Sequence, residues 1–207
     1  MNRTLIVTAL ALAVAGCSDP KAANNANFEK AIQAQLDQSY PKCYVTQNFP
    51  AVIEFDVGGQ RRILAALVKA GLVATTEKEV NAASFGNLKL SRTVTEYTLT
   101  DAGRKHYTAD ATKNLRGDPL GGFCFGKAEV TRIDEFIEPA DMMGARVSRV
   151  HYRYQVEQIP AWAKADDLLD ALPALKNDVA TQREPGQAHA VLVLTSNGWR
   201  HEVSARR

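Results

Sequence analysis

The sequence predicts an α+β fold, in which N-terminal helices precede a C-terminal antiparallel sheet with one packed helix. Phe28, Ile32 and Leu36 have the spacing of one face of a helix. Residues 146–159 instead alternate between apolar and polar side chains, which is the period of a half-buried strand. Asn197-Gly198 lies between two apolar runs, a pattern that strongly indicates a β-hairpin.

The composition is that of an ordinary globular protein. The chain has 207 residues, of which 45% are hydrophobic and 23% charged, and its formal net charge is +2. These values exclude a wholly disordered or collagen-like chain, and the charge is too balanced for an electrostatic nucleic-acid binder. A mean hydropathy of −0.24, with a single short apolar run, excludes a polytopic membrane protein.

The first 17 residues, MNRTLIVTALALAVAGC, have the pattern of an export signal. Arg3 supplies the positive charge, and the apolar run from Leu5 to Val14 is too short to span a ~30 Å hydrocarbon core. The sequence Val14-Ala15-Gly16-Cys17 resembles the bacterial lipobox. That resemblance implies cleavage before Cys17 and attachment of palmitate-type chains to Cys17. The alternative is an ordinary exported protein in which Cys17 is coincidental.

The lipobox resemblance also implies a location and an N-terminal organisation. Ser18, directly after the lipidated cysteine, is similar to the default signal for the outer membrane, so we expect the periplasmic face of that membrane rather than the inner membrane. Residues 1–16 would then be the signal peptide of this lipoprotein. Residues 17–27, which contain no apolar side chain larger than Ala apart from Cys17 and Pro20, would be a flexible tether.

The remaining cysteines, Cys43 and Cys124, form an even pair in a compartment that would be oxidising. The sequence therefore predicts a disulfide between them, which would close a loop of roughly 80 residues. Two free buried thiols are the alternative. A zinc site is disfavoured because neither a second CxxC nor paired histidines accompany them.

Residues 28–120 predict helices and short strands. Asn27 is the predicted cap of the first helix, and Tyr40-Pro41 ends it because proline disfavours helix in the preceding residue. Residues 108–122 are polar and end in DPLGG, which predicts a loose boundary. The other predicted elements are a strand or extended segment over 49–57, a helix over 60–70, a strand over 93–99 and a helix over 102–107.

Residues 61–107 resemble the winged-helix module of MarR- and PadR-type regulators. The resemblance lies in LAALVKAGLV at residues 64–73 and YTLTDAGR at residues 97–104, which match a helix that leads into a hairpin wing and its return strand. In such a module the helix before the wing enters the major groove of DNA. The acidic residues Glu77, Glu79 and Glu96, together with export, argue against nucleic acid as a partner. A chance helix and hairpin is the alternative.

Residues 121–207 predict the antiparallel sheet. In the strand over 146–159, Val150 and Tyr152 face one side while His151 and Arg153 face the other. Pro160 is expected to open a helix that extends to Leu172. The remaining predicted elements are strands over 123–130 and 131–137, a turn over 139–144, and a hairpin of strands over 188–195 and 199–204. The ending NGWRHE at residues 197–202 resembles that of proteobacterial lipoproteins.

The sequence contains no recognisable catalytic, cofactor-binding or metal-binding motif. The four histidines lack metal-ligand spacing, and Walker, GxSxG and SxxK patterns are absent. Asp166, Asp167 and Asp170 share one helical turn, which indicates a solvated face in preference to a cation site. His151, Arg153 and Glu157 are either a polar recognition strip or the wet side of the sheet.

Two classes of function remain. The favoured hypothesis is a non-catalytic, membrane-anchored periplasmic lipoprotein that binds an envelope protein or component, with no cofactor. The alternative is an envelope hydrolase with an unrecognised site. We expect Arg153 and Arg200 to contact the partner, since arginine is enriched at binding hot spots. Trp199 either joins them or closes the core of the hairpin.

Overall fold

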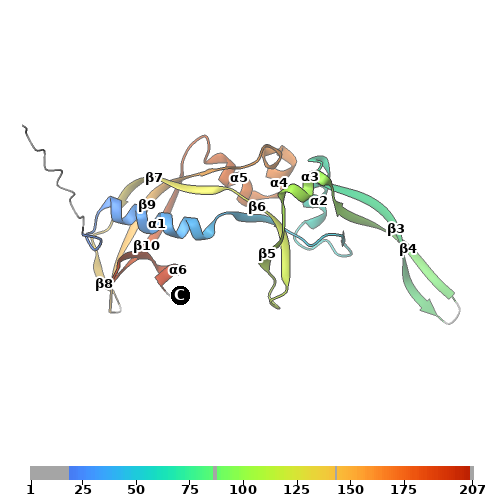
Figure 1. The fold of residues 1–207 in the computed structure, drawn as a ribbon, viewed down its shortest axis with the longest axis horizontal. Coiled ribbons are helices and arrows are strands. Elements are labelled where there is room, and N and C mark those ends of the chain that lie inside the picture. The colour runs from blue at the N-terminus through green and yellow to red at the C-terminus, as the bar shows by residue number, and fades with distance from the viewer. Residues whose placement is uncertain (1–18, 86–87, 143, 206–207) are drawn as a thin grey trace, which may run out of the picture.

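In the computed structural model, which describes residues 19–85, 88–142 and 144–205, the chain has the α+β fold that the sequence predicts. Its strands form three antiparallel sheets with the orders β11-β10-β9-β7, β1-β6-β5 and β2-β4-β3, and β8 lies beside β9. The long axis of the molecule has helix α1 near one end and the hairpin β3–β4 at the other (Figure 1). Among the described residues, no helix is long and apolar enough to cross a bilayer.

The largest sheet is curled and holds α1 (Asn25–Ser39) on its inner side (Figure 1). Phe28 and Ile32 of α1 are fully buried against Val150 and Leu192 of the sheet, which explains the helical apolar spacing of α1 and the alternation in β9. The strands of this sheet are β7 (Lys127–Phe136), β8 (Ala140–Met142), β9 (Ala145–Glu157), β10 (Gly186–Thr195) and β11 (Gly198–His201).

Helix α1 begins earlier than predicted. Asn24 is its cap and accepts a hydrogen bond from the backbone N–H of Asn27 at 2.9 Å, so the prediction that Asn27 caps the helix is wrong. The Asn27 side chain donates instead to the carbonyls of Asp19 and Ala22, at 2.9 and 2.8 Å. Residues 19–24 of the predicted tether therefore turn back onto the start of α1. The predicted end before Pro41 is confirmed.

The second sheet contains β1 (Lys42–Thr46), β5 (Tyr107–Lys113) and β6 (Pro119–Phe125). Cys43 and Cys124 lie opposite each other in β1 and β6 and form the predicted disulfide, with a Cα–Cα distance of 3.9 Å. The prediction of a loose boundary over 108–122 is wrong, because these residues belong to the β5–β6 hairpin. Buried Phe123 lies in this sheet and packs in a second apolar core, separate from the one between α1 and the largest sheet.

Helices surround that second core. Leu64 and Leu67 of α2 (Gln60–Lys69) are buried in it with Leu168 of α4 (Asp166–Ala171) and Leu175 of α5 (Pro173–Ala180). The predicted helix from Pro160 to Leu172 is divided into the 3₁₀ turn Ala161–Lys164 and α4, and α5 was not predicted. A short helix α6 (Glu202–Ala205) replaces the end of the predicted last strand.

The third sheet consists of β2 (Ala51–Val52), β3 (Val73–Phe85) and β4 (Leu88–Leu99). Strands β3 and β4 form a long hairpin that projects from the body (Figure 1), and we call this hairpin the arm. The predicted strand over 49–57 is too long, since only two of its residues pair with β4. Helix α3 (Asp101–His106) follows the arm, as predicted.

Candidate functional site

The base of the arm is fastened where its two strands enter and leave the body. The backbone N–H of Thr100 donates to the Leu72 carbonyl at 3.0 Å, and its hydroxyl donates to the Gly71 carbonyl at 2.7 Å. A Cβ at Gly103 would lie 1.9 Å from the Leu72 oxygen, so only glycine permits α3 to begin so close to β3. The direction in which the arm leaves the body is therefore fixed.

Beyond its base, the arm exposes both of its faces. Residues 74–79 of β3 and 91–93 of β4 are all exposed, and no described arm side chain beyond Val73 is buried. Cross-strand pairs place Glu77 with Thr95 on one face and Lys78 with Val94 on the other. Two-stranded ribbons are marginally stable alone, and strands of this length extend about 40 Å at 3.3 Å per residue. Over residues 74–79 and 91–93, the arm thus presents a polar surface on both faces that the body does not cover.

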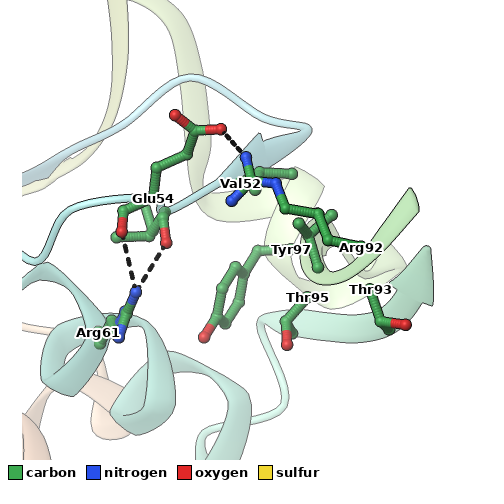
Figure 2. Close-up of a pocket in the computed structure, with 9 residues that line it drawn as sticks. Val52, Glu54, Arg61, Arg92, Thr93, Thr95 and Tyr97 are labelled. Carbon is green, nitrogen blue, oxygen red and sulfur yellow. Dashed lines mark hydrogen bonds and ion pairs between the residues drawn. The ribbon is translucent and has the colours of Figure 1, made fainter. Parts of the chain in front are cut away.

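A hollow of about 350 Å³ lies on the open side of β4, at the base of the arm (Figure 2). It begins where β2 stops pairing with β4, one residue beyond the Val52–Glu96 pair. The side chains around it come from the end of β2 and the segment after it, from the start of α2 and from β4. They include Val52, Glu54, Arg61, Arg92, Thr95 and Tyr97.

Arg61 keeps the segment after β2 away from β4. Its guanidinium donates to the carbonyls of Ile53 and Glu54 at 3.1 and 3.2 Å, as Figure 2 shows. Its backbone N–H donates to the Asp56 carboxylate at 3.0 Å. In a longer β2 one of these two consecutive carbonyls would face β4, and α2 satisfies both of them instead. This arrangement explains why β2 has only two residues and why the hollow exists.

The charge around the hollow is unbalanced. Arg92 forms an ion pair with Glu54 (Figure 2), and both side chains are about half exposed. The guanidinium of Arg61 donates to carbonyl oxygens rather than to a carboxylate. The residues that line the hollow thus supply two guanidinium groups and one carboxylate. An excess of positive charge at a partly desolvated surface favours an anionic group.

Exposed apolar side chains lie on the segment that continues from Glu54. Phe55 is 79% and Val57 72% exposed, and Val52 beside the hollow is 38% exposed. Large apolar side chains exposed within a few residues of one another mark candidate interaction surfaces. The hollow, its two arginines and this segment form the candidate binding site.

A second polar cluster ties α5 to β1. The carboxylate of Asp178, which is only 3% exposed, accepts hydrogen bonds from the hydroxyls of Tyr40 and Tyr44 at 2.9 and 2.6 Å. The same Oδ2 atom lies 3.1 Å from Nζ of Lys42. Burial, and then the Asp178 charge and hydrogen bonds, raise the pKa of the Tyr40 and Tyr44 phenols. Both phenols remain protonated donors at neutral pH, so this cluster is built to hold a buried carboxylate in place.

The two arginines predicted to contact a partner lie on one face but far apart. Arg153 pairs with Gln187 of β10, whereas Arg200 pairs with Val193 of the same strand. Gln187 and Val193 are six positions apart in β10, which is roughly 20 Å at 3.3 Å per residue. Arg153 also forms an ion pair with Asp134, with 3.1 Å between Nε and Oδ2. The structure does not bring these residues into one site.

Trp199 belongs to the core. It is 7% exposed, its ring meets Phe28 edge to face at 5.0 Å, and its Nε1 donates to the Lys21 carbonyl at 3.1 Å. Of the two alternatives drawn from the sequence, the core position is confirmed. The same contact holds residues 19–24 beside the β10–β11 hairpin.

The other polar residues that the sequence singles out lie on the surface. His151 is exposed opposite His189 on the outer face of the large sheet, with ring centroids 6.2 Å apart. Asp167 and Asp170 form ion pairs with Lys69 and Lys176, at 2.9 and 3.0 Å. Within residues 19–85, 88–142 and 144–205, no group of three or more His, Cys, Asp or Glu is placed to hold a metal ion. Cys17 lies outside the described residues.

Sequence reasoning missed the residues of both polar clusters. Glu54 and Arg92 are 38 positions apart and meet only because β4 runs alongside β2. Asp178 carries a faint sequence signal, since it is three residues after Leu175 and thus shares a helix face with a core residue. Comparison with protein-family models, with curated proteins and with solved structures finds no match.

Proposed function

We propose that this protein is a lipid-anchored lipoprotein of the bacterial envelope, which acts without catalysis by binding another envelope protein through the arm. Lipid on Cys17 would hold it to the periplasmic face of the outer membrane. The observation that carries the proposal is the exposure of both faces of the arm. A ribbon that buries so little of itself gains stability when a partner covers it.

The position of the arm supports this function. Residues 19–24, which follow the proposed lipid site, lead into α1, which lies near one end of the long axis (Figure 1). The Lys21 carbonyl in this segment accepts a hydrogen bond from Trp199. The arm leaves the body at the opposite end (Figure 1). An anchor at one end and a binding arm at the other would present the arm to proteins beyond the membrane surface.

The winged-helix resemblance is kept as part of this proposal. The order α2, β3–β4 and α3 is that of the resembling segment. In our proposal the wing is the protein-binding arm. Glu77 and Glu79 on β3, with Glu96 on β4, oppose contact with a phosphate backbone.

Lipidation is tested by growing cells with labelled palmitate. We expect the wild-type chain to be labelled and membrane-bound, and Cys17→Ser to be unlabelled and released. Acyl chains add about 0.8 kcal/mol per buried CH₂, so their loss removes the anchor. Equal labelling of the two proteins would contradict the lipoprotein assignment.

The arm is tested by shortening it. Replacing residues 81–91 with Asn-Gly keeps the Val80–Arg92 pair as the last pair before a two-residue turn, so both arginines that line the hollow remain. A photo-crosslinking residue placed at Thr76 or Glu77 of the full arm should form one discrete adduct with the same envelope protein. We expect retention of that protein in detergent extracts to fall at least about tenfold on shortening, as hot-spot losses do.

A matched control replaces residues 114–118, the turn of the β5–β6 hairpin, with Asn-Gly. Both shortened proteins should unfold within about 1 kcal/mol of the wild type, because none of the described side chains in the deleted segments is buried. Unchanged retention in the arm variant, or an absence of adducts from the arm, would contradict the binding function. Turnover of a peptidoglycan or peptide substrate by the purified protein would contradict its non-catalytic part.

A further inference from the structure

We propose that the open edge of β4 at the hollow receives an extended, acidic segment of the partner protein, which adds as a strand in the place that β2 leaves empty. This inference rests on the proposed binding function. It names the chemistry of the bound segment and the backbone that the segment pairs with.

The backbone of β4 is available for pairing at this edge. In the register of β2, Ile53 and Glu54 would lie opposite Thr95 and Val94, but the chain departs after Val52. Alternate residues of an antiparallel strand direct their N–H and C=O groups to the same side. Within Ser91–Thr95, therefore, part of the backbone faces the hollow, and no described strand pairs with it there.

The arm has a second open edge, on β3, but that edge is protected. Its middle carries the run Glu77-Lys78-Glu79, and charged side chains discourage strand addition. Along Ser91–Thr95 the single charge is that of Arg92, which is drawn toward Glu54. The edge of β4 is thus the more receptive of the two.

The hollow selects an acidic segment. Arg61 and Arg92 lie on opposite walls, and Glu54 is the one carboxylate among the lining residues. Glu54 is about half exposed, so an incoming carboxylate can replace it on Arg92 without the cost of burying an unpaired charge. Main-chain hydrogen bonds would give affinity, while this charge preference would give specificity.

The exposed apolar residues indicate what flanks the acidic position. Phe55 and Val57 lie on the chain that borders the hollow and expose most of their surface. Because side chains alternate along a strand, acidic residues interleaved with β-branched apolar ones would meet both features. The bound segment is therefore expected to alternate between carboxylate and apolar side chains.

Two blocked heptapeptides, TEVEVET and its lysine counterpart TKVKVKT, test this inference. Each is titrated as a labelled probe against the detergent-solubilised full chain. We expect the acidic peptide to bind at least about tenfold more tightly than the basic one, because like charges oppose the latter. Hydrogen exchange should slow in residues 91–95 when the acidic peptide is bound. Equal affinities, no binding, or protection confined to other segments would overturn the inference.

Reversal of one charge provides the matched comparison. Arg92→Glu should weaken the acidic peptide at least about tenfold and strengthen the basic one, because it inverts the charge of the hollow. Arg149→Glu makes the same change at an exposed position on the large sheet and should leave both affinities unchanged. Equal effects of the two substitutions would overturn the proposal.

The two proposals fail separately. If shortening the arm releases the natural partner but the peptides do not discriminate by charge, the arm binds without this strand addition. If shortening the arm leaves the partner bound, the proposed function fails, whatever the peptides do.

Discussion

Removal of the Cys43–Cys124 disulfide is expected to lower the free energy of unfolding by about 4 kcal/mol. The bridge joins residues 81 positions apart, so without it the unfolded chain gains the freedom of a large loop. In the folded protein, the backbone pairing of β1 with β6 still holds both positions opposite each other. The double variant Cys43→Ala, Cys124→Ala should therefore fold to the same structure with reduced stability.

Denaturant titration measures this loss. The double variant should unfold at a lower denaturant concentration and with a steeper dependence on denaturant, since a chain without the cross-link expands further when it unfolds. Cys17→Ser is the matched control, because it removes the remaining cysteine, which lies outside the described residues. A loss below about 1 kcal/mol would show that the bridge does not limit the unfolded state.

The elements predicted most accurately are those with strong local patterns. β9 was recognised from alternation alone because its inner face packs on α1, so its buried side chains must be apolar at every second residue. α2 was recognised because it buries one apolar stripe and Gly71 follows it at a positive φ. Asn197-Gly198 predicts its hairpin because the φ of Gly198 is +105°.

The elements that were missed lack such a one-sided environment. β5 has no buried residue, and its pairing with β6 is interrupted between Thr108 and Thr112, so no periodic pattern marks residues 108–122 as strands. Only the base of β4 was predicted, because residues 74–79 and 91–93 beyond the base have no buried face that would require apolar residues. The length of the arm is therefore invisible to a pattern that depends on burial.

The candidate site was the least predictable part. Arg61 is visible in the sequence as one of several basic residues of a helix, yet its role depends on the carbonyls that it meets eight and seven positions earlier. The hollow exists because β2 ends early and leaves part of β4 without a paired strand. Such a missing strand pairing produces no recognisable pattern of residues in the sequence. Charge at the site likewise depends on Glu54 and Arg92 meeting across the fold.

Asp178→Ala is expected to destabilise the protein by about 3 kcal/mol. The substitution leaves several buried hydrogen-bond donors without an acceptor, which costs more than the loss of one contact. The Asp178 carboxylate accepts hydrogen bonds from Tyr40, Tyr44 and Lys42, which lie more than 130 positions earlier in the chain. Without it, two half-buried phenols lose their acceptor, and α5 loses its polar link to β1. Asp178→Asn should cost less, since it keeps a carbonyl acceptor in a side chain of the same shape, although it loses the charge and replaces one oxygen with an NH₂ donor.

A double-mutant cycle separates this role from simple packing. Tyr44→Phe alone should cost about 1 kcal/mol, the value of one hydrogen bond. Combined with Asp178→Ala, it should add little, because the hydroxyl that it removes has already lost its acceptor, and the coupling energy should be about 1 kcal/mol. Tyr97→Phe, outside the cluster on β4, should instead add its full cost to that of Asp178→Ala. Strict additivity of Asp178→Ala and Tyr44→Phe would show that the carboxylate stabilises the fold without relying on that hydroxyl.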